Sequence, residues 1–262
     1  MNYRVTIISG IYNCADTLDE AVESILAQTY KGWKWVLCDD GSTDNTYQKA
    51  KEYADQYDNI ILIQNDRNRG LNYTLNHCLE YADTEYVARM DGDDISLPDR
   101  LEKEVQFLDA HPEYAIVSTG MLYFDEKGTF MKRIPKEHPD KRDFPKGTPF
   151  SHAPCMVRKE AFGAVKGYSE SEKLLRVEDY HLWIKMYAKG FRGYNIPEAL
   201  YMMRDDREAY HRRAFKYRVN EARVKTIAVK ELRLPFTSNI HALKPLLVGL
   251  MPEGLYKKLR NR

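Results

Sequence analysis

Short apolar runs alternate with longer amphipathic segments through the first third of the chain. Four runs have the length and composition of buried strands: residues 5–8, 35–38, 60–63 and 86–90. A polar loop follows each run, and helical spacing such as that of Leu18, Val22, Ile25 and Leu26 follows the first loop. This repetition predicts an α/β fold with a mostly parallel central sheet flanked by helices, whose ligand crevice runs along the carboxyl ends of the strands.

The rest of the chain carries weaker signals. Periodicity predicts helices over 101–108, 179–189 and 209–232, and strands over 115–118, 130–133 and 151–158. Residues 135–149 are rich in Pro, Lys and Arg and poor in apolar residues, so a surface loop is expected there.

Three carboxylates follow the fourth predicted strand directly. Asp91, Asp93 and Asp94 are interrupted only by Gly92, which would let the backbone come close to a ligand. Carboxylates this close repel one another unless a cation lies between them, and their hard oxygens favour Mg²⁺ or Mn²⁺. The alternative is an acidic turn that caps the helix opened by Pro98.

A second pair of acids, Asp39 and Asp40, follows the second predicted strand. In a parallel sheet both acidic strand ends lie at the same edge, so a nucleotide can place its base near this pair and its phosphates near a metal. No Gly-x-Gly-x-x-Gly follows the first strand and no Gly-Lys-Ser/Thr occurs, so the metal is expected to hold the phosphates. Ser42 or Thr43 is expected to cap the next helix.

Composition is that of an ordinary soluble globular protein, with 43% hydrophobic and 30% charged residues among 262. The net charge of +1 hides an asymmetry, because residues 204–262 hold 15 Lys/Arg against 6 Asp/Glu and residues 1–203 hold 25 against 33. We therefore expect the acidic part, residues 1–203, to carry the metal site, and residues 204–262 to form a helical basic extension that suits an anionic surface. No nucleic-acid partner is expected.

The cysteines and the hydropathy pattern predict the compartment. The four cysteines are widely spaced with no Cys-x-x-Cys pair, so buried thiols in a reducing compartment are expected rather than disulfides or zinc ligands. No apolar run reaches the roughly 18 residues of a spanning helix. We expect a cytoplasmic protein that is neither exported nor integral to a membrane.

An apolar stripe precedes a basic cluster near the end of the sequence. Its members fall on one side of a helix: Ile240, Leu243, Leu246, Leu247 and Leu250. With the Lys and Arg of residues 255–262, this pattern is typical of a helix on an anionic membrane surface and predicts peripheral association with the inner face of the cell membrane. The alternative is that the stripe packs on the catalytic domain.

Four stretches carry a resemblance to a known family. They are residues 5–8 with Tyr12 and Asn13, residues 39–44, residues 88–101 and residues 177–183. In this order, across residues 4–203, they resemble the family-2 glycosyltransferases of the GT-A fold, particularly the bacterial enzymes of exopolysaccharide, capsule and lipopolysaccharide assembly.

The resemblance implies an inverting, metal-dependent glycosyltransferase whose catalytic domain spans residues 1–203. Its donor would be a nucleotide-diphosphate sugar, most often a UDP-sugar, and its acceptor a hydroxyl of a glycan or a lipid-linked acceptor. Asp179 would be the general base, with Glu178 next in line, and Mn²⁺ or Mg²⁺ would be bound directly by Asp93. The residues implied to hold the nucleotide are Asp40 and Asp39 at the base, Tyr12 and Asn13 in the first loop, Arg69 or Arg67 along the nucleotide, and Asp91 near the ribose and the metal.

Two positions depart from the family pattern. Members often have Pro-Thr where this chain has Gly10 and Ile11, which would alter the contacts to the base. They commonly have a second acid where His181 stands. Because His181 follows Asp179 by two helical residues, it points away from that residue, and we expect it to pack or to face the acceptor.

Simpler readings and other functions stay open at this level. Glu178 and Asp179 also suit the positive end of a helix dipole, His77 and His152 are expected to be structural, and Trp183 is expected in the core. A sugar-phosphate nucleotidyltransferase would need a Gly-rich basic loop after the first strand, whereas residues 9–16 contain one Gly and no Lys or Arg. A non-enzymatic interaction protein on a transferase scaffold is the third reading.

Overall fold

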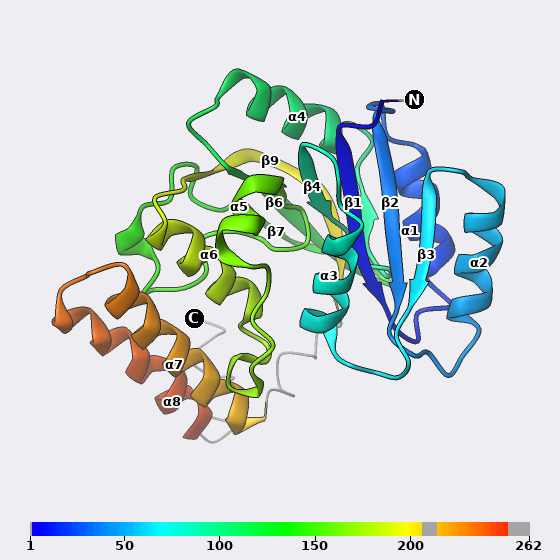
Figure 1. Cartoon of the computed structure of the whole chain (residues 1–262). Coiled ribbons are helices and arrows are strands. Elements are labelled where there is room, and N and C mark those ends of the chain that lie inside the picture. Colours follow the sequence, from blue (N-terminus) through cyan, green and yellow to red (C-terminus); the bar gives the residue numbers. More distant parts are fainter. Residues whose placement is uncertain (1, 206–213, 251–262) are drawn as a thin grey trace.

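A computed structural model describes residues 2–205 and 214–250 of the chain. Within them, one mixed sheet has the strand order β3-β2-β1-β4-β8-β6-β9-β5, with β7 paired to β6 (Figure 1). The strands are β1 (Val5–Ile11), β2 (Trp33–Asp39), β3 (Ile60–Gln64), β4 (Tyr86–Arg89), β5 (Ile95–Ser96), β6 (Ile116–Asp125), β7 (Gly128–Arg133), β8 (Met156–Arg158) and β9 (Gly193–Arg204).

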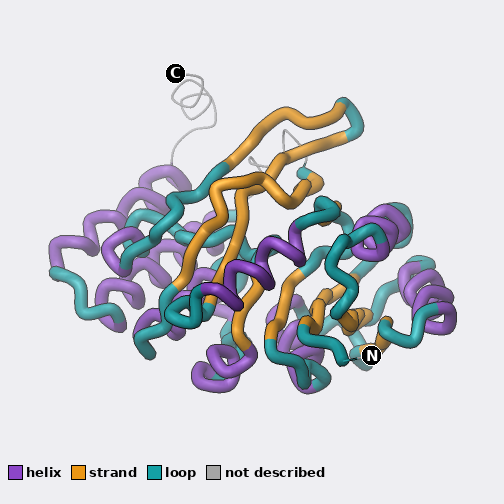
Figure 2. The backbone as a smooth tube through the Cα atoms, turned by 90° about the horizontal axis from the view of Figure 1, so that it is seen from above, coloured by secondary structure: helices purple, strands orange, loops and turns teal. Residues whose placement is uncertain are grey.

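Helices pack on both faces of this sheet, as the view from above shows (Figure 2). The α-helices are α1 (Leu18–Leu26), α2 (Thr46–Gln56), α3 (Leu71–Glu80), α4 (Arg100–Ala110), α5 (Lys159–Val165), α6 (Glu178–Ala188), α7 (Phe215–Glu231) and α8 (Leu243–Leu250). The short 3-10 helices are η1 (Lys141–Asp143), η2 (Glu172–Leu174) and η4 (Phe236–Ala242).

The amino-terminal half of the sheet is parallel. Strand β1 pairs in parallel with β2 and β4, and β2 pairs in parallel with β3. The register places Ile11 of β1 beside Asp39 of β2, and Ile8 of β1 beside Arg89 at the end of β4, so the loops after these strands open at one edge. The expected α/β fold with helices on both faces is confirmed.

Each face of the sheet has its own hydrophobic core, because successive residues of a strand point to opposite faces. Ile8 packs into the core formed with α3, α5, α6 and α7, whereas Ile7 packs into the core formed with α1, α2 and α4. Burial on both faces explains why these strands are continuous apolar runs in the sequence. The expectation of buried thiols holds for Cys38, Cys78 and Cys155, and all four cysteines are free.

Strand β9 is the main element that the sequence pattern did not reveal. It pairs in parallel with β6 and antiparallel with β5, and so completes the carboxy-terminal half of the sheet. Pro197 and Glu198 interrupt its apolar pattern, and its register with β6 shifts on both sides of Gly120. A strand tolerates a proline at such an irregularity, which also hides the strand from periodicity.

Two segments differ in structure or length from what the sequence predicted. Residues 135–149 are more than a surface loop, because they contain η1 and bury Phe144 against the rings of Tyr180 and Tyr187. The strand predicted over 151–158 is limited to β8, because only its last three residues pair with β4 and β6.

Helix α7 packs on α6 and on the segment that precedes it. Val224 and Ala228 belong to the same core as α6, and Asn220 Nδ2 donates a hydrogen bond to the carbonyl oxygen of Leu175 over 3.1 Å. The helix predicted over 209–232 is observed from Phe215, while residues 206–213 lie outside the described part.

The apolar stripe on η4 and α8 faces outward. Ile240, Leu247 and Leu250 are 67%, 63% and 72% exposed, beside Phe236 at 86%. No helix in the described ranges is long and apolar enough to cross a membrane. The basic cluster of residues 255–262 lies outside the described residues.

Candidate active site

Asp40 lies at the edge where the parallel strands end, and backbone amides fix its carboxylate. Its Oδ1 accepts hydrogen bonds from Asn65 Nδ2 over 2.7 Å and from the amide of Arg69 over 2.8 Å. Its Oδ2 accepts from the amide of Gly70 over 2.8 Å, where a φ of 85° lets the loop after β3 fold back over β2. Oδ2 retains acceptor capacity for a ligand.

Asp39 has a different environment from its neighbour. It is fully buried, and its Oδ2 accepts from the amide of Ser42 over 3.2 Å and from Gln64 Nε2 over 3.0 Å. It holds the loop after β2, whereas Asp40 lines an open cleft.

This central cleft has a volume of about 430 Å³. One wall comes from the loops after β1, β2 and β3 and from α3: Gly10, Tyr12, Asp40, Asn68, Gly70, Leu71, Asn72 and Thr74. The other wall comes from the loop before α6, from α6 and from α7: Leu175, Arg176, Glu178 and Tyr217. Of this second wall, the sequence predicted only Glu178 as a site residue. Arg176 could have been suspected because it lies two residues before Glu178. Nothing in the sequence indicated that Tyr217 lines the cleft.

The loop after β1 is held by side chains from the loop after β2. Asn13 has a φ of 47°, and its Oδ1 accepts a hydrogen bond from the backbone amide of Thr43 over 2.9 Å. The backbone amide of Asn13 donates to Ser42 Oγ over 3.1 Å. Ser42 and Thr43 therefore join two loops, and the prediction that one of them caps α2 is wrong. The helix begins at Thr46, whose amide donates to Asp44 Oδ1 over 3.0 Å.

Gly10 lies near the end of β1, where α3 packs against the strand. A Cβ at this position would lie 2.9 Å from Thr74 Cγ2 and 3.2 Å from Leu71 Cδ1. The close approach of the helix explains why this chain has a glycine here, at a position that lines the central cleft.

The three acids after β4 converge. Carboxylate oxygens of Asp91, Asp93 and Asp94 all lie within 4.8 Å of one another. Arg89, which sequence reasoning did not single out, pairs with Asp91 through both ends of its guanidinium, with Nη1 donating to Oδ2 over 2.6 Å. Asp94 Oδ1 accepts from the amide of Arg204 over 2.8 Å, and its Oδ2 is buried without a hydrogen-bond partner among the described residues.

This arrangement fits a divalent cation. Burial, followed by the charge of Asp91, raises the pKa of Asp93, and burial with the charges of Asp91 and Asp93 raises the pKa of Asp94 to about 8. Three hard oxygen donors, one of them an unpartnered buried oxygen, form the kind of set that Mg²⁺ or Mn²⁺ prefers.

Gly92 allows close packing of the acidic turn. A Cβ there would lie 2.8 Å from Ile11 Cγ2 and 3.0 Å from Cys14 Sγ. The acidic turn thus packs directly on the loop after β1, which brings the acid cluster beside the cleft wall that carries Tyr12.

Glu178 and Asp179 begin α6, where the helix dipole favours both charges. Burial, followed by the nearby charge of Glu178, raises the pKa of Asp179 to about 6, and Arg89 opposes that shift. A carboxylate with this pKa is ionised at neutral pH and is a stronger base than an exposed aspartate. Glu178 lines the central cleft and has a buried Oε2 without a hydrogen-bond partner in the described chain.

The predicted arginines do not line the central cleft. The guanidinium of Arg69 lies 4.2 Å from the ring centroid of Tyr73, and only its backbone amide contacts Asp40. Arg67 forms an exposed ion pair with Asp66 at 3.6 Å.

The histidines and Trp183 have the packing roles that we expected. His181 Nδ1 lies 3.0 Å from Ser169 Oγ, and burial lowers the pKa of this histidine to about 4. His152 Nε2 lies 2.8 Å from the hydroxyl of Tyr168, and Trp183 is fully buried.

Comparison with protein families identifies the class of protein. The family described as glycosyl transferase family 2 matches residues 6–165, and glycosyl transferase family group 2 matches residues 86–248. The chain belongs to glycosyl transferase family 2. It is therefore an enzyme, as the four sequence stretches predicted.

Relatives of this family-2 glycosyltransferase extend over most of its length. A Bacillus subtilis protein named as the glycosyltransferase EpsE is 46% identical over 260 residues, covering 99% of this chain and 94% of its own. The amylovoran biosynthesis glycosyltransferase AmsE of Erwinia amylovora is 28% identical, covering 98% and 99%. The Escherichia coli enzyme WfaP, named as a UDP-Glc:alpha-D-GlcNAc-diphosphoundecaprenol beta-1,3-glucosyltransferase, is 29% identical, covering 73% of each chain.

Solved structures confirm the GT-A fold of this family-2 glycosyltransferase. TarS of S. aureus in complex with UDP-GlcNAc superposes with a TM-score of 0.71 at 20% identity, covering 94% of this chain and 71% of that chain. The mannosyltransferase PcManGT of Pyrobaculum calidifontis, in complex with GDP-Man and Mn²⁺, gives 0.67 at 20% identity, covering 100% and 79%.

Proposed function

We propose that this family-2 glycosyltransferase moves a sugar from a nucleoside-diphosphate donor to a hydroxyl of a glycan or lipid-linked acceptor in bacterial surface polysaccharide synthesis. The donor that we favour is a UDP-sugar, and the transfer inverts the configuration at the anomeric carbon. The observation that carries the proposal is the position of two acidic groups at one edge of the parallel strands, the amide-fixed carboxylate of Asp40 and the acid cluster after β4. Asp179, a third acid with a raised pKa, follows Glu178 of the cleft wall and is near enough to Arg89 of β4 for that charge to act on it.

The central cleft is suited to the donor nucleotide. The free acceptor capacity of Asp40 Oδ2 matches the imide N–H of uracil, and Tyr12, 45% exposed at the same wall, offers a ring face to the base. The named complexes of TarS with UDP-GlcNAc and of PcManGT with GDP-Man support a nucleotide-sugar donor.

Asp93 and Asp91 would hold Mn²⁺ or Mg²⁺ beside the donor diphosphate. When bound, the ion neutralises the negative charge that develops on the leaving diphosphate. Arg89 keeps Asp91 in place beside Asp93, so the cluster is ordered before any ligand arrives.

Asp179 would act as the general base. The acceptor hydroxyl oxygen forms a bond to the anomeric carbon while the bond from that carbon to the diphosphate oxygen breaks, and the hydroxyl proton passes to the Asp179 carboxylate. A single displacement of this kind inverts the anomeric configuration. General-base assistance contributes about 10²–10⁴ in rate.

Release of nucleoside diphosphate from a set of UDP- and GDP-sugars, measured with and without Mn²⁺, tests this proposal. We expect release of UDP from a UDP-sugar that requires the metal and accelerates with acceptor. Formation of pyrophosphate from a nucleoside triphosphate and a sugar 1-phosphate would instead support a nucleotidyltransferase. Binding of nucleotide-sugars without turnover under any condition would support a non-enzymatic role.

We further propose that η4 and α8 attach the enzyme peripherally to the inner face of the cell membrane. The exposed side chains of Phe236, Ile240, Leu247 and Leu250 provide the apolar face, and the excess of Lys and Arg after residue 203 provides attraction to anionic lipid. The diphosphoundecaprenol acceptor in the name of WfaP supports a membrane-bound acceptor.

A further inference from the structure

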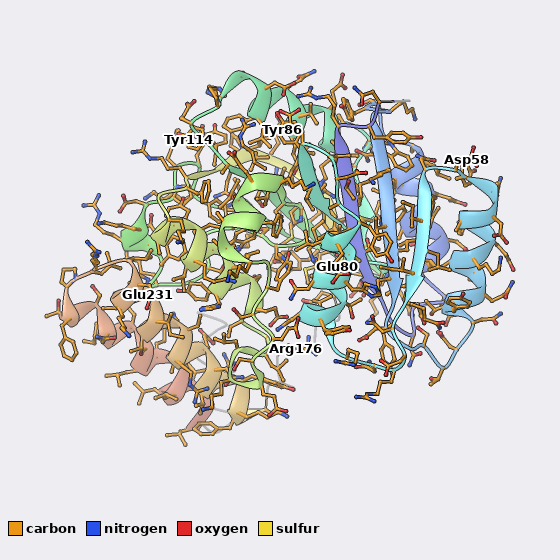
Figure 3. All side chains as sticks on the ribbon, in the orientation of Figure 1. Asp58, Glu80, Tyr86, Tyr114, Arg176 and Glu231 are labelled. Atoms are coloured by element: carbon orange, nitrogen blue, oxygen red, sulfur yellow. The ribbon has the colours of Figure 1, made fainter. Side chains whose placement is uncertain are left out.

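A second groove lies on the flank of the molecule, apart from the central cleft. It consists of two adjoining hollows of about 580 and 640 Å³ that share Lys141 and Tyr187. Tyr114 lines one hollow of this flank groove and Glu231 the other, and in Figure 3 both labels stand to the left of Arg176, which lines the central cleft. Hollows of this size hold small organic ligands in other proteins.

Cations dominate the lining. They come from η1, from the ends of α6 and α7, and from the loop before β9: Lys141, Lys189, Lys230, Arg192 and Arg233. All five side chains are exposed, and within the described residues none of them forms an ion pair. Of the two acids in the groove, Asp140 is already paired with Arg142 at 2.7 Å, so the groove has an excess of free positive charge.

Helix dipoles account for only part of this excess. Lys189 and Lys230 lie at the carboxyl ends of α6 and α7, where a cation stabilises the helix. Arg233 comes directly after the C-cap residue of α7, in the left-handed conformation (φ of 53°) that ends many helices, and the amide of Leu234 donates to the carbonyl oxygen of Val229 over 2.9 Å. Lys141 and Arg192 belong to neither helix end.

Aromatic rings form the other end of the flank groove. Tyr114 and His138 line it, and the ring of Tyr194 supports both, at 5.8 Å and 5.0 Å between centroids. Tyr194 itself stacks on Phe107 at 4.3 Å, so the ring cluster is fixed from below. The C–H faces of sugar rings pack on aromatic rings of this kind, while carboxylates or phosphates on the same chain would meet the cations.

We propose that the flank groove is a second binding site for an acidic oligosaccharide, one that carries carboxylates or phosphates. The proposal rests on the proposed function, because a polysaccharide-building enzyme gains from a second attachment point. A chain held there raises the effective concentration of its growing end at the central cleft without any new contact to the reacting atoms.

Calorimetric titration of the full chain tests the groove directly. The probes are a short oligogalacturonate and its fully methyl-esterified form, which keeps the sugar backbone and removes the charge. We expect the charged probe to bind, the ester to bind far more weakly, and high salt to weaken the charged probe. Lys189→Gln with Lys230→Gln should weaken it about tenfold.

Lys127→Gln with Lys132→Gln is the matched control, because these exposed lysines lie on the β6–β7 hairpin outside the groove. Tyr114→Ala should also weaken the charged probe, with an unchanged salt dependence. Circular dichroism and thermal melting establish that each variant is folded.

Equal binding of the charged probe and its ester, an equal loss of binding in the control variant, or no binding of the charged probe would overturn the proposal.

Anionic vesicles and an oligothymidylate are further probes. If the groove variants lose only the vesicles or only the oligothymidylate, the ligand is a lipid headgroup or a nucleic acid and the glycan assignment is wrong. UDP release with a short acceptor should stay at the wild-type level in both double variants, and its absence from the wild type would refute the proposed function while leaving the binding result intact.

Discussion

At the scale of single residues, burial changes what Asp179 can do. Its carboxyl group sits at the start of α6 beside Glu178, and its pKa is raised to about 6 by burial and by that neighbouring charge. We expect Asp179→Asn to lose two or more orders of magnitude in turnover while UDP affinity stays at the wild-type level, because the amide keeps the shape but cannot accept a proton. Steady-state kinetics and calorimetry measure the two quantities. Turnover within about tenfold of wild type would move the base to Glu178.

The same pKa predicts a pH dependence. The base must be ionised, so kcat should be constant above about pH 7 and should fall about tenfold per pH unit below pH 6. The measurement is kcat over pH 4.5–8 at saturating donor and metal. A profile that stays flat down to pH 5 would show that a carboxylate with an ordinary pKa acts as the base.

Asp93 is one of the three carboxylates of the acid cluster after β4. Asp93→Ala removes one of three converging carboxylates, so it relieves repulsion in the free protein and deletes a proposed metal ligand. We expect metal-dependent UDP binding to be lost and the melting temperature to be unchanged or raised. Asp58→Ala, at an exposed position between α2 and β3 that Figure 3 labels, is the control. Unchanged UDP affinity in the presence of Mn²⁺ would refute the assignment of Asp93.

At the scale of elements, the contact between the acidic turn and the loop after β1 decides the shape of the site. Gly92 allows this contact, because any Cβ would meet the β-branched side chain of Ile11 at 2.8 Å. We expect Gly92→Ala to destabilise the fold by about 1–3 kcal/mol and to weaken Mn²⁺ binding as the turn moves. Chemical denaturation and a metal titration measure both effects. Gly128→Ala offers a comparison in open space, where strain at its φ of 96° acts without a clash.

Helix α7 is an element whose role extends beyond its sequence neighbourhood. Val224 of α7 packs in the core that also holds α3, α5 and α6. Tyr217 lines the central cleft, and Lys230 lines the flank groove. The basic segment after residue 203 therefore bears on both binding surfaces, although its division from residues 1–203 stays a prediction.

At the scale of the whole molecule, the exposed stripe of η4 and α8 predicts where the enzyme works. We expect the full chain to sediment with anionic liposomes at low salt and to be released at high salt, because each nearby Lys or Arg contributes about 1 kcal/mol of attraction to an anionic surface. Removal of residues 239–262 should weaken sedimentation, and Leu247→Glu should do so without loss of thermal stability, since this side chain is 63% exposed. Full-length protein that stays in the supernatant at low salt would refute membrane attachment.

The sequence by itself determined the elements whose signal is local. Apolar runs marked β1 to β4, because strands buried on both faces must be apolar throughout, and parallel pairing then placed Asp40 and the acids after β4 at one edge. The four stretches at residues 5–13, 39–44, 88–101 and 177–183 were together sufficient to recognise the family. These features depend on residues close together in the chain.

Tertiary structure alone decided the features that depend on partners far apart in sequence. Strand β9 is a strand because β6 and β5 pair with it, despite Pro197. Asp40 and Asp39 are adjacent in sequence, yet only the folding of the loop after β3 places amides around Asp40 and so separates a ligand-facing acid from a structural one. Tyr217 lines the central cleft because α7 packs in the same core as α6. Periodicity along the chain contains no information about contacts between residues so distant in sequence.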